Sequence, residues 1–226
     1  MSSAAASPLR ILCVHGYRQN SSSFREKTGA LRKLLRKQVE FIYMNAPHQI
    51  PSSNASQVQE NCTKISDEDQ RGWWFSDVQA HSFDARQECE SSLGLEDSLE
   101  AVRTAVKDLG PFHGILGFSQ GAALVAMVCA LQEQKVEPSF DFSFAVLVAG
   151  FRSACAQHQR FYENVEITLP TLHVFGQDDK VIPEQMSRDL LPIFSAAEVL
   201  THPGGHFIPA ASAHKRIYLE FLKKFQ

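Results

Sequence analysis

The amino-acid sequence predicts an α/β fold: a compact, mostly parallel sheet of roughly six strands with helices on both faces. Short, nearly continuous apolar runs alternate along the chain with longer segments whose apolar residues recur at helical spacing. This alternation is typical of a parallel sheet that helices cover. The predicted strands are Leu9–Val14, Val39–Met44, Phe112–Leu116, Phe142–Ala149, Thr171–Phe175 and Glu198–Thr201.

The segments between these strands carry helix signals. Ser23-Phe24-Arg25-Glu26 has the pattern of a capping box and predicts a helix that runs to about Lys37. The apolar residues of Leu95–Leu109 follow helical spacing, and Gly110-Pro111 ends that helix. The run Ala122–Leu131 is apolar on nearly every side, as expected of a helix packed against the middle of a sheet.

One long segment interrupts this alternation. The 226 residues fit a single domain. Residues 46–92, however, are rich in Pro, Ser, Asn, Gln and acidic residues, with Arg71-Gly72-Trp73-Trp74-Phe75 in the middle. A connection of this length is usually a functional loop or a lid. Two interpretations stay open, because the tryptophans either contact a substrate or anchor the segment onto the sheet.

Composition and charge exclude several classes of protein. The net charge of −3 gives no electrostatic case for nucleic-acid binding. No apolar stretch reaches the roughly 18 residues of a membrane span, so we expect no stable membrane insertion. Met1–Pro8 has no secretory pattern and the five cysteines include no C-x-x-C pair, so we expect a cytoplasmic protein, a nuclear presence being compatible. No cluster of Cys and His has metal-ligand spacing, so neither a metal nor a cofactor is expected.

The pentapeptide Gly117-Phe118-Ser119-Gln120-Gly121 lies where a predicted strand gives way to a helix. A nucleophilic serine needs such a sharp turn, because the turn exposes the hydroxyl and directs the N-terminus of the helix at the reaction centre. Glycines on both sides let strand and helix approach closely. The pattern predicts Ser119 as the nucleophile of an acyl transfer, with the backbone N–H of Gln120 as one oxyanion donor.

The acid of such a site should follow a late strand. Two adjacent aspartates, Asp178 and Asp179, follow Thr171–Phe175. Asp179 is favoured because it lies three residues after Gly176 and four before Pro183, a spacing common in hydrolase loops. Asp178 is then expected to hold the turn through nearby backbone amides.

The base should come last in the chain, and three histidines follow the acid. His206 is favoured, because Gly204-Gly205-His206-Phe207 can fold tightly over the edge of the sheet. His202 directly ends the last strand and is the weaker competitor. His214 lies in a terminal helical pattern and is expected to be solvated.

A second oxyanion donor is expected from the loop after the first strand. That loop contains His15-Gly16-Tyr17, and the backbone N–H of Tyr17 is the predicted donor. Aromatic residues around the serine predict an apolar wall that favours fatty acyl or long alkyl esters over charged substrates. The predicted substrate-binding residues are Trp73, Trp74, Phe75, Phe118, Phe151 and Phe207.

Taken together, the motifs around His15, Trp73, Ser119, Asp179 and His206 resemble the FSH family of serine hydrolases, a compact branch of the α/β-hydrolases. This resemblance implies a Ser119–Asp179–His206 triad and hydrolysis of carboxylic esters. The pentapeptide also resembles acyl-protein thioesterases and lysophospholipases, which share the chemistry. A hydrolase-derived binding protein is the alternative from another class. The sequence predicts a small apolar ester as ligand and no particular protein partner.

Overall fold

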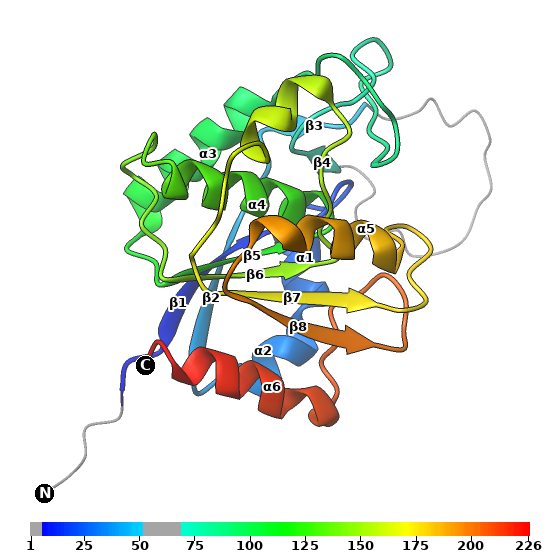
Figure 1. Ribbon diagram of the computed structural model, residues 1–226. Coiled ribbons are helices and arrows are strands. Elements are labelled where there is room, and N and C mark those ends of the chain that lie inside the picture. The colour runs from blue at the N-terminus through cyan, green and yellow to red at the C-terminus, as the bar shows by residue number, and fades with distance from the viewer. Residues whose placement is uncertain (1–5, 52–68) are drawn as a thin grey trace, which may run out of the picture.

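The computed structural model describes residues 6–51 and 69–226. Its centre is a six-stranded sheet in which every pair of neighbouring strands is parallel, as the sequence predicts (Figure 1). In the order of the sheet, the strands are β2 (Val39–Met44), β1 (Leu9–Val14), β5 (Gly114–Phe118), β6 (Phe144–Val148), β7 (Thr171–Gly176) and β8 (Ala197–His202).

Helices cover both faces of this sheet (Figure 1). One face carries α1 (Ser21–Lys27), α2 (Gly29–Leu35) and α6 (Ser212–Lys223). The other face carries α3 (Leu95–Leu109), α4 (Gln120–Glu133) and α5 (Glu184–Leu190). A separate antiparallel pair, β3 (His48–Gln49) and β4 (Arg71–Gly72), and the 3₁₀ turns η1 (Ala156–Phe161) and η2 (Leu191–Ile193) complete the described elements.

The predicted start of the first helix is wrong by three residues. Asn20, not Ser23, is the N-cap: its side chain accepts from the Ser23 N–H at 2.9 Å, and the Ser23 hydroxyl accepts from the Asn20 N–H at 3.0 Å. The single predicted helix is also two, because α1 ends at Lys27. The Thr28 hydroxyl donates to the Phe24 carbonyl at 2.8 Å, a local bond that competes with continuation of the helix.

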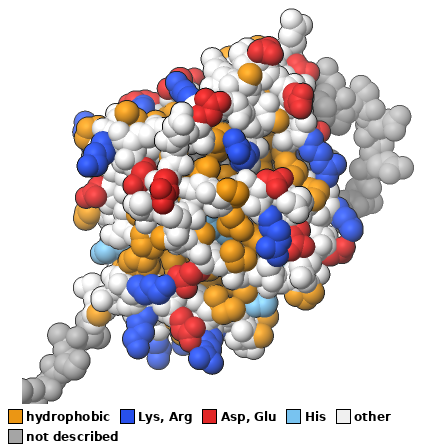
Figure 2. Space-filling view, viewed as in Figure 1, with side chains coloured by type: hydrophobic (Ala, Val, Ile, Leu, Met, Phe, Trp, Pro, Cys, Tyr) orange, Lys and Arg blue, Asp and Glu red, His pale blue; other side chains and the backbone are white. Residues whose placement is uncertain are grey.

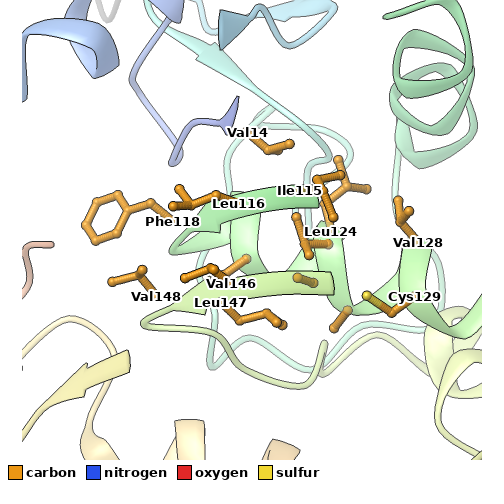
Figure 3. Close-up of a cluster of buried hydrophobic side chains, with 14 of the residues drawn as sticks. Val14, Ile115, Leu116, Phe118, Leu124, Val128, Cys129, Val146, Leu147 and Val148 are labelled. Atoms are coloured by element: carbon orange, nitrogen blue, oxygen red, sulfur yellow. The ribbon is translucent and has the colours of Figure 1, made fainter. Parts of the chain in front are cut away.

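A cluster of buried apolar side chains lies where α4 packs against β5 and β6 (Figure 3). All α4 residues from Gln120 to Ala130 are buried, which explains why this helix shows no polar face. Burying one Leu or Val side chain contributes about 1.5–3 kcal/mol, so this layer is a large part of the folding free energy. It also fixes the carboxyl end of β5, where Ser119 lies.

Two buried histidines lie in the sheet layer. His15 follows β1, and its Nδ1–H donates to the Gly16 carbonyl at 2.7 Å while Nε2 accepts from the Ala46 N–H at 3.0 Å. His173 lies in β7, 2.9 Å from the Thr171 hydroxyl. Burial lowers the pKa of His15 to about 4 and that of His173 to about 3. Both rings are therefore neutral in the folded protein at neutral pH.

Acidification should destabilise the fold through these two rings. In the unfolded chain they protonate at a pH of about 6.5, so below it the unfolded state binds more protons than the folded state. The free energy of unfolding should fall as the pH drops from about 6.5 towards 4, by at most about 1.4 kcal/mol per pH unit for each histidine. Urea unfolding at several pH values measures this, and His173→Gln should remove one histidine's share. Equal stability at both ends of that range contradicts the assignment.

Candidate active site

Ser119 occupies the turn between β5 and α4 in a strained backbone conformation. Its φ of 57° and ψ of −120° lie outside the regions that non-glycine residues favour. The Ser119 N–H donates to the Val148 carbonyl of β6 at 2.9 Å, which holds the turn against the neighbouring strand. The residue is 8% exposed, and its side chain faces a cavity of about 570 Å³.

The glycines of the pentapeptide allow the backbones to approach. A Cβ on Gly121 would lie 2.3 Å from the carbonyl oxygens of Val14 and His15. A Cβ on Gly117 would lie 2.4 Å from the Gly121 carbonyl oxygen. Since neither contact is physically tolerable, a larger residue at Gly121 would push α4 away from β1, and one at Gly117 would push α4 away from β5. Either change would move Ser119.

Asp179 and His206 form a directed pair at the ends of β7 and β8. His206 Nδ1–H donates to Asp179 Oδ2 at 2.7 Å, and the N–H groups of Val181 and Ile182 donate to Oδ1 at 2.9 Å. Burial alone raises the pKa of the Asp179 carboxyl, but the hydrogen bonds from His206 and these amides outweigh it and hold the pKa below its ordinary value. Asp179 is therefore a carboxylate that fixes the tautomer of His206, with Nε2 as the proton acceptor.

Two adjacent loops bring this pair together. The N–H of Asp178 donates to the Gly204 carbonyl at 3.1 Å, and the N–H of Gln177 donates to the His202 carbonyl at 2.8 Å. The His206 ring packs against the Phe118 ring, their centroids 4.7 Å apart, and His206 lines the same cavity as Ser119. The structure thus places the three predicted residues at one site.

The competing residues have other contacts. Asp178 is exposed, and its carboxylate pairs with Lys180 at 2.8 Å. The expectation that it holds the turn through backbone amides is wrong, because the amides of the turn donate to Asp179 instead. His202 is buried, and its Nδ1 accepts from the Gly204 N–H at 3.2 Å, so it supports the loop that carries His206. His214 lies on α6, half-buried rather than fully solvated, with its ring centroid 6.5 Å from that of His202.

The two predicted oxyanion donors are free in the described part of the chain. There, the N–H groups of Tyr17 and Gln120 donate to no backbone or side-chain acceptor. Gln120 is the first residue of α4, where helix geometry leaves its N–H without a partner inside the helix. Both amides lie in segments that border the cavity, as an oxyanion hole requires.

The Gln120 side chain ties these segments to the two tryptophans. Its Oε1 accepts from the Trp73 N–H and its Nε2 donates to the Trp74 carbonyl, both at 2.9 Å. The Trp73 indole N–H donates to the His15 carbonyl at 2.7 Å. The backbone before Tyr17 and the residue after Ser119 are therefore fixed by one buried network. The sequence could not reveal it, since nothing in the local pattern pairs Gln120 with Trp73.

The prediction that four of the aromatic residues bind substrate is corrected. Trp73, Trp74, Phe75 and Phe151 are 0–3% exposed and do not line the cavity. They pack into the interior instead. The tryptophans are thus anchors of the described part of the segment 46–92, whereas residues 52–68 lie outside the described residues.

Phe118 and Phe207 do line the cavity. Sequence reasoning missed Phe24, since an apolar residue on an amphipathic helix is expected in the core, and Ile208, which lies in the loop before α6. It also missed the polar side chains of Lys27 and Gln70. The full lining is Gly16, Tyr17, Arg18, Gln19, Phe24, Lys27, Gln70, Phe118, Ser119, His206, Phe207 and Ile208.

A second histidine also contacts serines. His158 Nε2 lies 2.7 Å from the Ser92 hydroxyl, and Nδ1 lies 2.6 Å from the Ser153 hydroxyl. Burial lowers the pKa of His158 to about 4, and no carboxylate contacts the ring among the described residues. This cluster lacks the acid that orients a catalytic histidine and is best explained as a structural network. Within the described ranges no group of His, Cys, Asp and Glu is arranged to bind a metal ion, and no helix is long and apolar enough to cross a membrane.

The parallel sheet, the strained serine and the aspartate–histidine pair define an α/β-hydrolase, and the comparisons agree. The family model described as serine hydrolase (FSH1) matches residues 1–218, so the chain belongs to this family of hydrolases. The chain is 71% identical to "Esterase OVCA2" of Danio rerio, covering 98% of this chain and 100% of that one. It is 47% identical to "Esterase OVCA2" of Homo sapiens, covering 98% and 99%.

Solved structures show the same fold at low identity. The esterase PE8 superposes with a TM-score of 0.64 at 19% identity, covering 98% of this chain and 94% of that one. Acyl-protein thioesterase 2 of Zea mays superposes with a TM-score of 0.64 at 17% identity, covering 98% and 97%. These similarities show the fold alone.

Exchanging each aspartate separately tests which carboxylate acts. Asp179→Asn keeps the shape but cannot stabilise a protonated His206, so kcat should fall by about 10²-fold or more. Asp178→Asn, the matched control, should cost about tenfold at most, since in the described part of the chain the Asp178 carboxylate pairs with exposed Lys180. Steady-state ester hydrolysis measures both, and the reverse ranking would move the acid to Asp178.

Proposed function

We propose that this chain is a carboxylic ester hydrolase that works through an acyl-enzyme on Ser119. The observation that carries the proposal is the 2.7 Å bond between His206 and a buried Asp179, beside a cavity that Ser119 also lines. A histidine with a purely structural role needs neither an ionised carboxylate bonded to its Nδ1 nor a strained serine in the same cavity. A hydrolase-derived binding protein, the alternative from another class, has no use for this combination.

The reaction follows from the positions of these groups. His206 Nε2 takes the proton as Ser119 Oγ attacks the ester carbonyl, and the N–H groups of Gln120 and Tyr17 stabilise the oxyanion. His206 then gives the proton to the departing alcohol. Water then attacks the acyl-enzyme as His206 takes its proton. The bond between Ser119 Oγ and the acyl carbon breaks, His206 returns the proton to Oγ, and the carboxylic acid leaves. Asp179 stabilises the protonated imidazole in both steps.

The cavity walls support an ester with an apolar chain. Phe24, Phe118, Phe207 and Ile208 form the apolar part of the lining. A chain that contacts such walls gains about 0.8 kcal/mol for each buried CH₂, or about fourfold in kcat/KM when the gain persists in the transition state. Long-chain acyl or alkyl esters are the substrates that use this gain most.

A thioester hydrolase is the second candidate. The fold similarity to acyl-protein thioesterase 2 of Zea mays favours it, and the same three residues would cleave a thioester. The two functions differ in the leaving group, so matched oxygen esters and thioesters separate them.

Hydrolysis should depend on chain length through Phe207. For oxygen esters of increasing acyl length, kcat/KM should climb by up to about fourfold per CH₂ until the cavity is filled. Phe207→Ala should flatten the climb, because Phe207 is a 51% exposed residue of the cavity wall. Val136→Ala removes an exposed apolar side chain elsewhere and is the control. Faster cleavage of the matched thioesters would favour the second candidate, and rates indifferent to length would contradict the apolar substrate.

A further inference from the structure

The wall of the cavity beside Ser119 includes two positively charged side chains that ester cleavage itself does not use. Arg18 and Lys27 both line it, and its described lining contains no Asp or Glu. Among the described residues neither forms an ion pair. On the face in Figure 2, by contrast, Lys and Arg side chains lie among Asp and Glu side chains. The charged side chains of the described lining are therefore all positive, although the protein as a whole has a net charge of −3.

Arg18 is held at the cavity wall by the backbone. Its φ of 70° is in the left-handed region, where a glycine would be expected. Two bonds maintain it, from the Arg18 N–H to the Arg71 carbonyl at 2.9 Å and from the Arg71 N–H to the Gln19 carbonyl at 3.0 Å. Non-glycine residues held in this region concentrate at functional sites.

The Arg18 guanidinium is oriented by two neighbours in the cavity wall. It lies over the Tyr17 ring at 5.5 Å, and its Nη1 is 3.5 Å from Gln70 Oε1. Neither neighbour neutralises the charge. The planar group keeps donors for an oxyanion, which it can bind through two hydrogen bonds at once.

Lys27 extends this cationic rim from α1. It lies one helical turn after Phe24, so the two side chains share a face of the helix. Phe24 belongs to the apolar wall and Lys27 is exposed. The same cavity thus offers an apolar surface followed by a positively charged one.

We propose that the natural substrate is an anionic ester, an apolar chain with a carboxylate or phosphate group that Arg18 and Lys27 bind. This inference rests on the proposed ester hydrolysis at Ser119 and specifies its substrate class. An exposed ion pair contributes about 1.4- to 5-fold in affinity, so the two positively charged side chains together should favour the anion by about 2- to 25-fold.

Four esters with the same chain and leaving group test this preference, ending in a methyl, a carboxamide, a carboxylate or a phosphate. The carboxamide is polar but uncharged and isolates the effect of charge. We expect a higher kcat/KM for an anionic ester than for the carboxamide, mainly through a lower KM. The advantage should shrink as salt rises, because the Debye length falls below about 10 Å above 0.1 M. Comparing kcat/KM for the carboxylate ester and the phosphate ester identifies which anionic group the cavity prefers.

Variants assign the preference to the two cations. Arg18→Gln and Lys27→Gln should each lower the anion-to-carboxamide ratio of kcat/KM by about 1.4- to 5-fold. Arg18→Lys keeps the charge and should retain most of the ratio. Lys33→Gln removes the same charge from an exposed residue of α2 that does not line the cavity. This control should leave the ratio unaltered.

A ratio of one or less in the parent enzyme overturns the inference, as does a ratio that neither glutamine variant changes. With neutral esters still hydrolysed at Ser119, that result leaves the proposed function intact. If no ester is cleaved and a fluorophosphonate does not modify Ser119, the proposed function and this inference both fail.

Discussion

The close contact of β1, β5 and α4 is the constraint on which the site depends. Gly117 and Gly121 let these backbones approach to distances that no Cβ permits, and Ser119, in the turn between them, has a positive φ. The strain costs on the order of 1–3 kcal/mol. Burial of the whole inner length of α4 offsets it many times over, so core packing keeps the serine hydroxyl at the cavity.

Hydrogen bonds hold the segments on both sides of Ser119 in place. On one side, the Gln120 carboxamide and the Trp73 indole connect the start of α4 with the loop after β1. On the other, the loops after β7 and β8 are bonded to each other and present His206 to Asp179. The proposed oxyanion donors and the proposed base are therefore held in place without substrate, which limits the reorganisation that catalysis would require.

The parts that the sequence predicts are those with a local pattern. The parallel sheet follows from the apolar runs. The motifs around Ser119, Asp179 and His206 predict residues that the fold brings together, since Ser119 and His206 line one cavity and Asp179 bonds to His206. The prediction that the first helix begins at Ser23 is wrong because Asn20 is the N-cap residue in the structure. The tryptophans were misassigned as substrate contacts because their partners, Gln120 and the His15 carbonyl, lie more than forty residues away in sequence. Long-range hydrogen bonds leave no periodic signal.

The central claim is that Ser119 is the nucleophile, and identifying the serine that a fluorophosphonate modifies tests it most directly. The protein contains a second pairing of serine and histidine, at His158 with Ser92 and Ser153, so the outcome is not trivial. Mass spectrometry of the digested adduct should find the phosphonyl group on Ser119 alone, with loss of ester hydrolysis in proportion to labelling. A label on Ser92 or Ser153, or full activity after Ser119 is labelled, would contradict the account.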